Sequence, residues 1–155
     1  MFGFACFGGT PRLGASAPPA SIEEAIAAAL AGSPELAELV GPNIHPDDRP
    51  SWVPLDALIY SVASETPDKS LDGSTGVRVA RVEFEGHSLS RRSARQISEA
   101  AVALLLSIER QTIGGVFFST VIHDQDSEAY VDQGNGNPCP YRWHSPELMV
   151  RYRLV

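Results

Sequence analysis

The stretch at residues 70–76, Ser-Leu-Asp-Gly-Ser-Thr-Gly, constrains the fold most, because it separates two segments of strand-like composition. Its Asp-Gly pair tolerates positive φ, and the neighbouring polar residues extend the turn into a loop that is too polar to bury. The following segment, residues 77–85, alternates so that Ala80, Val82 and Phe84 share one face. The opposite face carries Arg81, Glu83 and Glu85. The pattern predicts a hairpin with one buried and one solvated face.

Two short helices are predicted before this hairpin. Ser21 and Glu24 have the spacing of a capping box, which starts a helix that Gly32 ends. The apolar side chains on one face of this helix are Ile22, Ala25, Ile26, Ala29 and Leu30. A second helix begins with Pro34 at its first position and stops at Gly41. These residues build a core and indicate no chemistry.

A third helix, residues 90–108, has an apolar stripe that is expected to lie on a sheet. Four strands are predicted at residues 55–64, 77–85, 116–123 and 148–154. Loops are predicted at residues 42–54, 65–76 and 124–140. The expected fold class is α+β, with a single antiparallel four-stranded sheet covered on one face by helices, in the order α-α-β-β-α-β-β.

The chain divides into an N-terminal arm and one domain. Residues 21–155 are expected to form a single α+β domain, since this length is enough to bury a core. Residues 1–20 are rich in Gly, Pro, Ala and Phe and predict no periodic element, so we expect an extended arm. Phe2, Phe4 and Phe7 resemble the aromatic anchors of interfaces. The arm is expected to bind either its own domain or, preferably, a neighbouring subunit.

Charge and apolar patterning exclude several classes of protein. The formal net charge is −7 and the basic residues are scattered, which argues against reading a nucleic-acid sequence by contacts to many phosphates. No apolar run approaches the roughly 20 residues that span a bilayer, so no membrane segment is expected. The chain has two cysteines, Cys6 and Cys139, and no secretory signal is recognisable, so two reduced thiols are expected.

Residues 123–144 hold the strongest enzymatic pattern. His123, Asp124, Asp126 and Glu128 alternate in a way that suits a divalent metal, but they lack the fixed spacing of a known cation loop. A thiol nucleophile at Cys139 lacks an orienting acid near it in the sequence. We therefore predict no catalytic residue, no metal ligand and no cofactor. A small metal- or thiol-dependent enzyme that uses this segment is the alternative.

The order of these pieces resembles the tail-completion, or tail-terminator, proteins of long-tailed bacteriophages. The likeness is densest in Ser-Leu-Asp-Gly at residues 70–73, followed by a small residue, Gly, and a strand that contains Val82 and Phe84. The upstream helices, the exit Ile44-His45-Pro46 and the closing strand at residues 150–153 fit as well. The resemblance covers residues 21–155 and contains no catalytic motif.

The resemblance implies a structural protein of the virion, in the tail or neck, that is assembled in the host cytoplasm. Members of such a family form a hexameric ring on the tail tube, end its polymerisation and offer a joining surface to the head-side connector or stopper protein. DNA would pass through the lumen without sequence-specific binding. The partners implied are other copies of the chain, the tail tube protein and the connector.

Three groups of residues are predicted to serve these contacts. The loop at residues 65–76 is longer than a hairpin requires, so it is expected to reach an adjacent ring, unless its Asp-Gly pair serves only as a turn. The docking residues predicted in this loop are Asp68, Lys69, Leu71, Asp72, Gly73 and Gly76. Glu83 and Glu85 are candidates for an acidic lumen wall that repels DNA. The arm contributes the phenylalanines named above.

Overall fold

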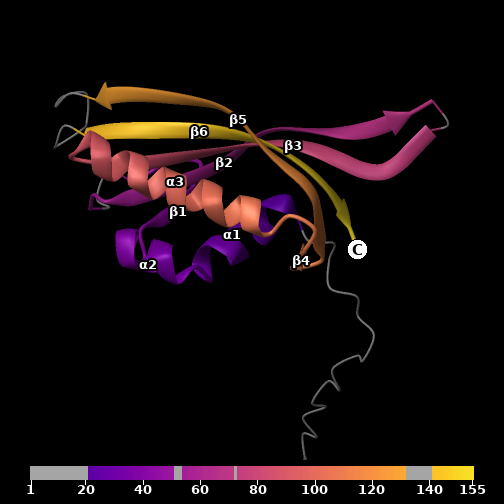
Figure 1. Cartoon of the computed structure of the whole chain (residues 1–155), viewed down its shortest axis with the longest axis horizontal. Helices are drawn as coiled ribbons and strands as arrows, with labels where there is room; N and C mark the ends of the chain where they lie inside the picture. The colour runs from indigo at the N-terminus through magenta and orange to yellow at the C-terminus, as the bar shows by residue number, and fades with distance from the viewer. Residues whose placement is uncertain (1–20, 51–53, 72, 132–140) are drawn as a thin grey trace, which may run out of the picture.

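The computed structural model describes residues 21–50, 54–71, 73–131 and 141–155. These residues form three helices and six strands (Figure 1). The helices are α1 (Ile22–Ala31), α2 (Pro34–Val40) and α3 (Arg91–Ser107). The strands are β1 (Ile44–Pro46), β2 (Ala57–Ser70), β3 (Gly73–Ser88), β4 (Thr112–Ile113), β5 (Val116–Val131) and β6 (Tyr141–Leu154).

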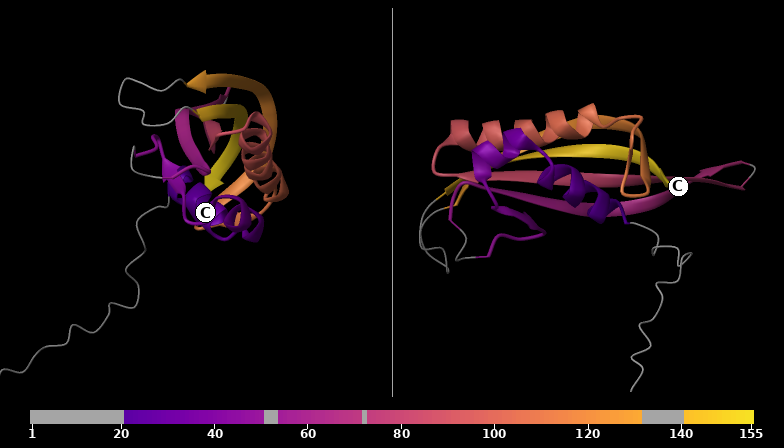
Figure 2. Two further views of the ribbon diagram at one scale, coloured as in Figure 1. Left: turned by 90° about the vertical axis from the view of Figure 1, so that its left-hand side faces the viewer. Right: turned by 90° about the horizontal axis from the view of Figure 1, so that it is seen from below.

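The six strands form one mixed and strongly curved sheet in the order β1-β2-β3-β6-β5-β4 (Figure 2). β1 pairs with β2 in parallel, whereas all other neighbours are antiparallel. The prediction of a four-stranded, purely antiparallel sheet is therefore wrong. The two missed strands, β1 and β4, have three and two residues, which is too short to show an alternating pattern.

The long strands also extend into segments that were predicted as loops. β2 continues to Ser70 and β3 starts at Gly73, so residues 65–76 form the end of a long hairpin and not a loop. Likewise, β5 continues through the first part of the predicted 124–140 loop before it ends at Val131. Both extensions carry polar side chains on both faces, and a strand without a buried face has no hydrophobic alternation to reveal it.

The helices begin and end where their local signals place them. Ser21 and Glu24 make both bonds of the capping box at the start of α1, with distances of 3.1 and 3.3 Å. Ser90 caps α3, whose apolar stripe packs on β3 and β6, with α1 and α2 beside it (Figures 1 and 2). The largest buried side chains of this core are Tyr152, Phe84, Phe118, Ile22, Ile26 and Leu30. Within the described residues, no helix is long and apolar enough to cross a membrane.

A bulge in β5 changes which side chains face the core. The sequence pattern places Phe118, Thr120 and Ile122 on one face, opposite Val121. The register shifts between Phe118 and Thr120, so Val121 turns inward and Ile122 turns outward, with 51% of its surface exposed. An extra residue in one strand reverses the alternation beyond it, which is why the prediction fails from this point onward.

Candidate functional site

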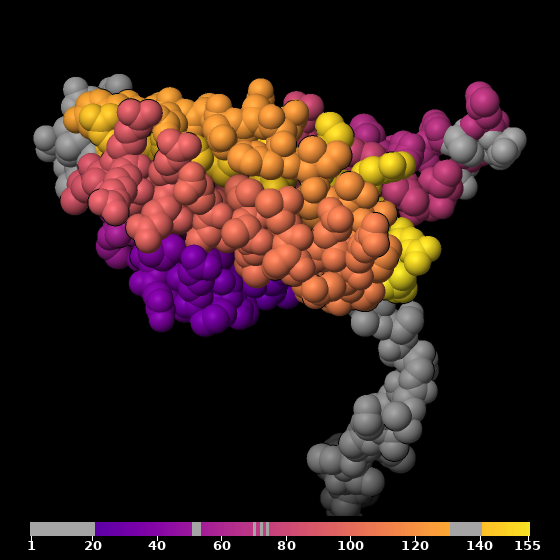
Figure 3. All heavy atoms as spheres, in the orientation of Figure 1, coloured from indigo at the N-terminus to yellow at the C-terminus, as the bar shows by residue number. Residues whose placement is uncertain are grey.

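The end of the β2–β3 hairpin, residues 65–76, stands out from the rest of the domain and is called the hairpin arm below (Figures 1 and 3). β6 accompanies β3 only as far as Val77, which pairs with Arg153. Gly73 and Gly76 have φ values of +117° and +73°, a backbone region that side chains with a Cβ rarely adopt. The turn therefore needs these glycines for their backbone conformation.

Polar contacts hold the base of the hairpin arm on β6. The hydroxyl of Tyr152 donates to the carboxylate of Glu65, and Arg78 binds the same carboxylate oxygen at 2.9 Å. Further along, Arg151 forms an ion pair with Asp68. The contacts of Tyr152 and Arg151 join β2 to β6 across the intervening β3, so they fix the direction in which the hairpin arm leaves the domain.

Electrostatics support the contact between Glu65 and Tyr152. The hydrogen bond from Tyr152 lowers the pKa of Glu65, and Arg78 lowers it further against the opposing effect of burial. Burial raises the pKa of Tyr152 well above its usual value, and the bond to Glu65 adds to this shift. Tyr152 is therefore a neutral donor at physiological pH, whereas Glu65 is an ionised acceptor.

The predicted docking residues separate into two roles. Asp68 contacts Arg151 and so helps to position the hairpin arm. Lys69 is exposed, and Leu71 at the tip is completely exposed. An exposed leucine at the end of a projecting hairpin is the kind of apolar group that a protein partner covers. Asp72 lies outside the described residues.

Sequence reasoning missed the residues that anchor the hairpin arm. Tyr152 and Glu65 are 87 positions apart, and Arg151 and Asp68 are 83 positions apart. No local pattern connects such distant residues. Only the position of β6 beside β3 brings them together.

The acidic residues Glu83 and Glu85 lie on the face of β3 that points away from the helices, and both are half-buried. Glu83 is directly opposite Glu147 of β6. Burial raises the pKa of Glu83, and repulsion from Glu147 and Glu85 adds to the effect. Arg81 pairs with Glu147 at 3.0 Å, and His87 contacts Glu85 at 2.8 Å. This face is acidic and only partly neutralised.

The enzymatic candidates come together as a small cluster between α3, β5 and β6. Asp126 Oδ1 lies 2.9 Å from His123 Nε2 and 3.7 Å from His144 Nε2. The other ring nitrogen of His144 contacts the hydroxyl of Ser98. In the described part of the chain, no group of three or more His, Cys, Asp or Glu residues is arranged to hold a metal ion. Cys139 lies outside this part.

Ser98, His144 and Asp126 resemble a catalytic triad only in composition. Ser98 is in the middle of α3 and is fully buried, so a substrate has no access to its hydroxyl. That hydroxyl donates to the carbonyl oxygen of Arg95 at 3.0 Å. Its other contact is Nδ1 of His144, so the hydroxyl links the backbone of α3 to β6. The geometry fits a structural contact between α3 and β6.

The chain is similar to known proteins both in its sequence and in its fold. The family model described as "Tail completion protein gp17" matches residues 24–133. Among solved structures, a chain from "Virion of native gene transfer agent (GTA) particle" has a TM-score of 0.63 at 15% sequence identity. The similarity covers 85% of this chain and 94% of that one, and it shows a shared fold. No curated protein gives a significant match.

Proposed function

The chain belongs to the family of tail completion protein gp17, structural proteins of the phage tail, and we propose that it forms a hexameric ring that caps the tail tube. In this role it ends polymerisation of the tube and presents a joining surface to the head-side connector. The observation that carries the proposal is the hairpin arm. It projects beyond the domain, is braced by Tyr152 and Arg151, and ends in the exposed Leu71.

The two sides of the sheet support assembly into a ring. In the described residues, β1 covers the outer edge of β2 only at residues 58–60, and no strand pairs with that edge from Ser61 to Ser70. At the other side, β4 pairs with β5 only at Val116 and Phe117. The two free edges differ, so contact between them is head-to-tail, and such contacts close into rings when the rotation fits.

Two residues restrict this pairing on the β2 side. Pro67 has no backbone N–H to donate, and the charge of Lys69 opposes close approach of another strand. We therefore place the strand contact between copies at residues 61–66. The tip of the hairpin arm remains for contact with the tube or with a sister subunit.

The acidic face supports the passage of DNA through the lumen without binding. Glu83, Glu85 and Glu147 lie on the side of the sheet that no described helix covers. If this face lines the channel, its negative charge repels phosphate groups and keeps the genome mobile. The net charge of −7 is consistent with a wall that DNA passes.

The enzymatic alternative gains no support from the described residues. Ser98 is buried in α3, and its hydroxyl is occupied by contacts with Arg95 and His144. We propose that the protein acts by binding its partners and catalyses no reaction.

A shortened hairpin tests the capping role. Pro67 and Arg78 already face each other, so replacing residues 68–77 with Asp-Gly keeps a hairpin and removes its reach. We expect a folded protein, as judged by circular dichroism, that fails to cap tails and leaves tubes of variable length in electron micrographs. Tails of normal length with this variant would show that the hairpin arm has no capping role.

A further inference from the structure

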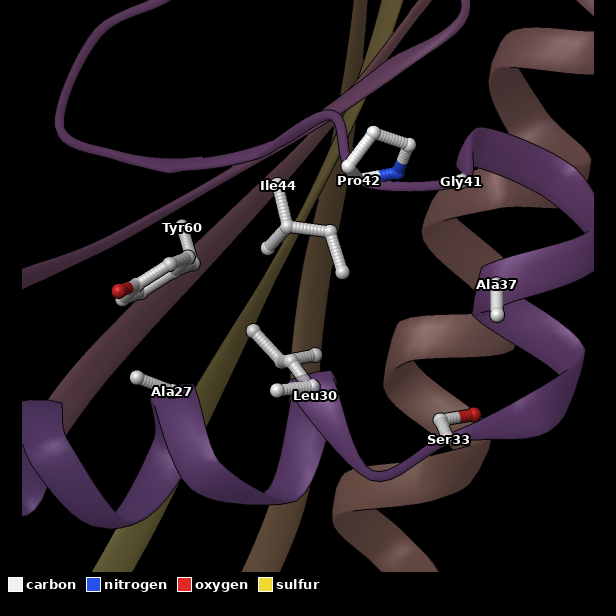
Figure 4. Close-up of a pocket in the computed structure, with 9 residues that line it drawn as sticks. Ala27, Leu30, Ser33, Ala37, Gly41, Pro42, Ile44 and Tyr60 are labelled. Atoms are coloured by element: carbon white, nitrogen blue, oxygen red, sulfur yellow. The ribbon is translucent and has the colours of Figure 1, made fainter.

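An open groove runs along α1 on the side that faces β1 and β2. It consists of two adjoining pockets of about 350 and 200 Å³, which share Ala27 and Tyr60. In the larger pocket, Ala27, Leu30, Ile44 and Tyr60 surround a common space (Figure 4). The combined volume is in the range of sites that bury apolar ligands or side chains.

The two ends of the groove differ in polarity. The larger pocket is lined mainly by apolar groups and ends at Gly41 and Pro42, after α2. The smaller pocket lies beside the first turn of α1 and is bordered by Glu23, Glu24 and Asp47. An occupant should therefore combine large apolar side chains with positive charge.

One segment of this chain has that composition. Residues 1–20 contain Phe2, Phe4 and Phe7, one basic residue, Arg12, and no acidic residue. Each phenylalanine brings a large apolar surface at a small cost in side-chain entropy. Arg12 complements the acidic border of the smaller pocket.

Resting on the assembly of copies proposed above, we propose that the groove binds residues 1–20 of a neighbouring copy, with phenylalanine side chains in the larger pocket. Twenty extended residues span up to about 66 Å. A compact domain with the length of this whole chain has a radius of gyration of only about 15 Å. The segment is thus long enough to reach beyond its own domain.

Chain geometry favours the neighbour over the same chain. Residues 1–20 join α1 at Ser21, beside the acidic end of the groove. The phenylalanines lie at the opposite end of this segment. To enter their own groove, the intervening residues would have to reverse direction and close a loop, which costs entropy. A groove on the next copy requires no such reversal.

The native Cys6, between Phe4 and Phe7, allows a direct test in the full-length protein. With Cys139→Ser removing the other native thiol, Ala27→Cys places a thiol in the groove. Ala28→Cys, an exposed position on the same helix outside the groove, is the matched control. Each variant is treated with diamide and examined on non-reducing gels.

We expect Ala27→Cys to form disulfide-linked dimers and larger ladders on the order of 100-fold faster than Ala28→Cys, because docking raises the effective thiol concentration to the mM range. Changing Phe2, Phe4 and Phe7 to Ser should abolish this difference. Rapid loss of thiols with only monomers on the gel would overturn binding to the neighbour in favour of the same chain. Equal slow rates for the two variants would overturn the groove as the binding site.

The mass of the untreated, reduced protein is measured separately by light scattering. A ring without rapid cross-linking would refute the groove proposal and leave the proposed function intact. Rapid cross-linking between copies without a ring would support the groove proposal and refute the proposed ring.

Discussion

A side chain at Gly86 of β3 would overlap the backbone carbonyl oxygen of Ala94 in α3. Its Cβ would also lie 3.1 Å from the backbone nitrogen of Ser98. The helix therefore approaches the sheet here as closely as a glycine permits. This contact sets the distance between α3 and β3. The burial of Ile97 and Ala101 on α3 depends on that distance.

Gly86→Ala should therefore destabilise the protein. The overlap is with backbone atoms that cannot move independently, and overpacking of this kind costs about 1–3 kcal/mol. Urea unfolding followed by circular dichroism measures the loss. Gly32→Ala is the control, because a Cβ there lies at an ordinary 3.4 Å from its nearest neighbour, the carbonyl oxygen of Ala28. Equal stability of the two variants would contradict the tight contact at Gly86.

Leu71→Ser should weaken assembly without changing the stability of the monomer. Leu71 is fully exposed at the tip of the hairpin arm, so the folded monomer gains nothing from its side chain. Its burial against a partner would contribute about 1.5–3 kcal/mol. Capping of tails in an assembly reaction, together with the melting temperature, measures the two effects. Leu89→Ser, at another exposed leucine, serves as the control and should cap normally.

Tyr152→Phe should lower the free energy of unfolding by about 1.5 kcal/mol at pH 7, because it removes a hydrogen bond to a charged acceptor. The folded-state pKa of Glu65 is lowered, so its contribution is present above the unfolded-state pKa and is lost as pH falls through the folded-state value. The difference between the variant and the wild type should therefore shrink as the pH falls below the unfolded-state pKa of Glu65 and through its folded-state value. Tyr130→Phe, at an exposed tyrosine, should show no such pH dependence.

Glu83→Gln should stabilise the protein at neutral pH. The pKa of Glu83 is raised, so the folded state binds this proton more tightly than the unfolded state does. Ionisation therefore costs stability as pH rises from the unfolded-state value through the folded-state value. The gain from Gln should appear over this range and be absent at lower pH. Glu85→Gln should not reproduce the gain, since it removes the carboxylate that contacts His87.

Charge reversal tests the proposed lumen wall. Glu83→Lys with Glu85→Lys should leave the monomer folded and raise retention of DNA by the assembled ring, most strongly at low salt. Glu35→Lys with Glu38→Lys on α2 changes the net charge equally at exposed positions on another face. Filter binding across a salt series compares the DNA retained by the β3 variant with the DNA retained by the α2 variant. If the β3 and α2 variants retain DNA equally, the effect comes from net charge alone and the β3 face has no special role.

Part of the candidate site was recognisable in the sequence. Gly73 and Gly76 adopt the positive φ that polar turns with glycine favour. Residues 65–76 form the end of a paired hairpin and not the predicted loop, whereas their docking role stays a prediction. The residues that brace this hairpin, Tyr152 and Arg151, come from β6 and could not be inferred from local patterns. The predicted sites at Phe2, Phe4, Phe7 and Asp72 lie outside the described residues and stay predictions.

Features that depend on neighbouring residues follow from the amino-acid sequence alone. The capping box at Ser21 starts α1, and the alternation at Ala80, Val82 and Phe84 defines the buried face of β3. Such signals act within a few positions and keep their meaning in any fold. The order of these elements also indicates the family, and the match to the family model confirms it.

Other features depend on which strands the folded chain places side by side. The short β1 becomes a strand because β2 offers it an edge, and the polar ends of β2 and β3 stay paired because each supplies the other's hydrogen bonds. The bulge before Thr120 exchanges the burial of Val121 and Ile122 to suit the curved sheet. In each case backbone hydrogen bonds between paired strands set the outcome, and these bonds are nearly independent of side-chain identity.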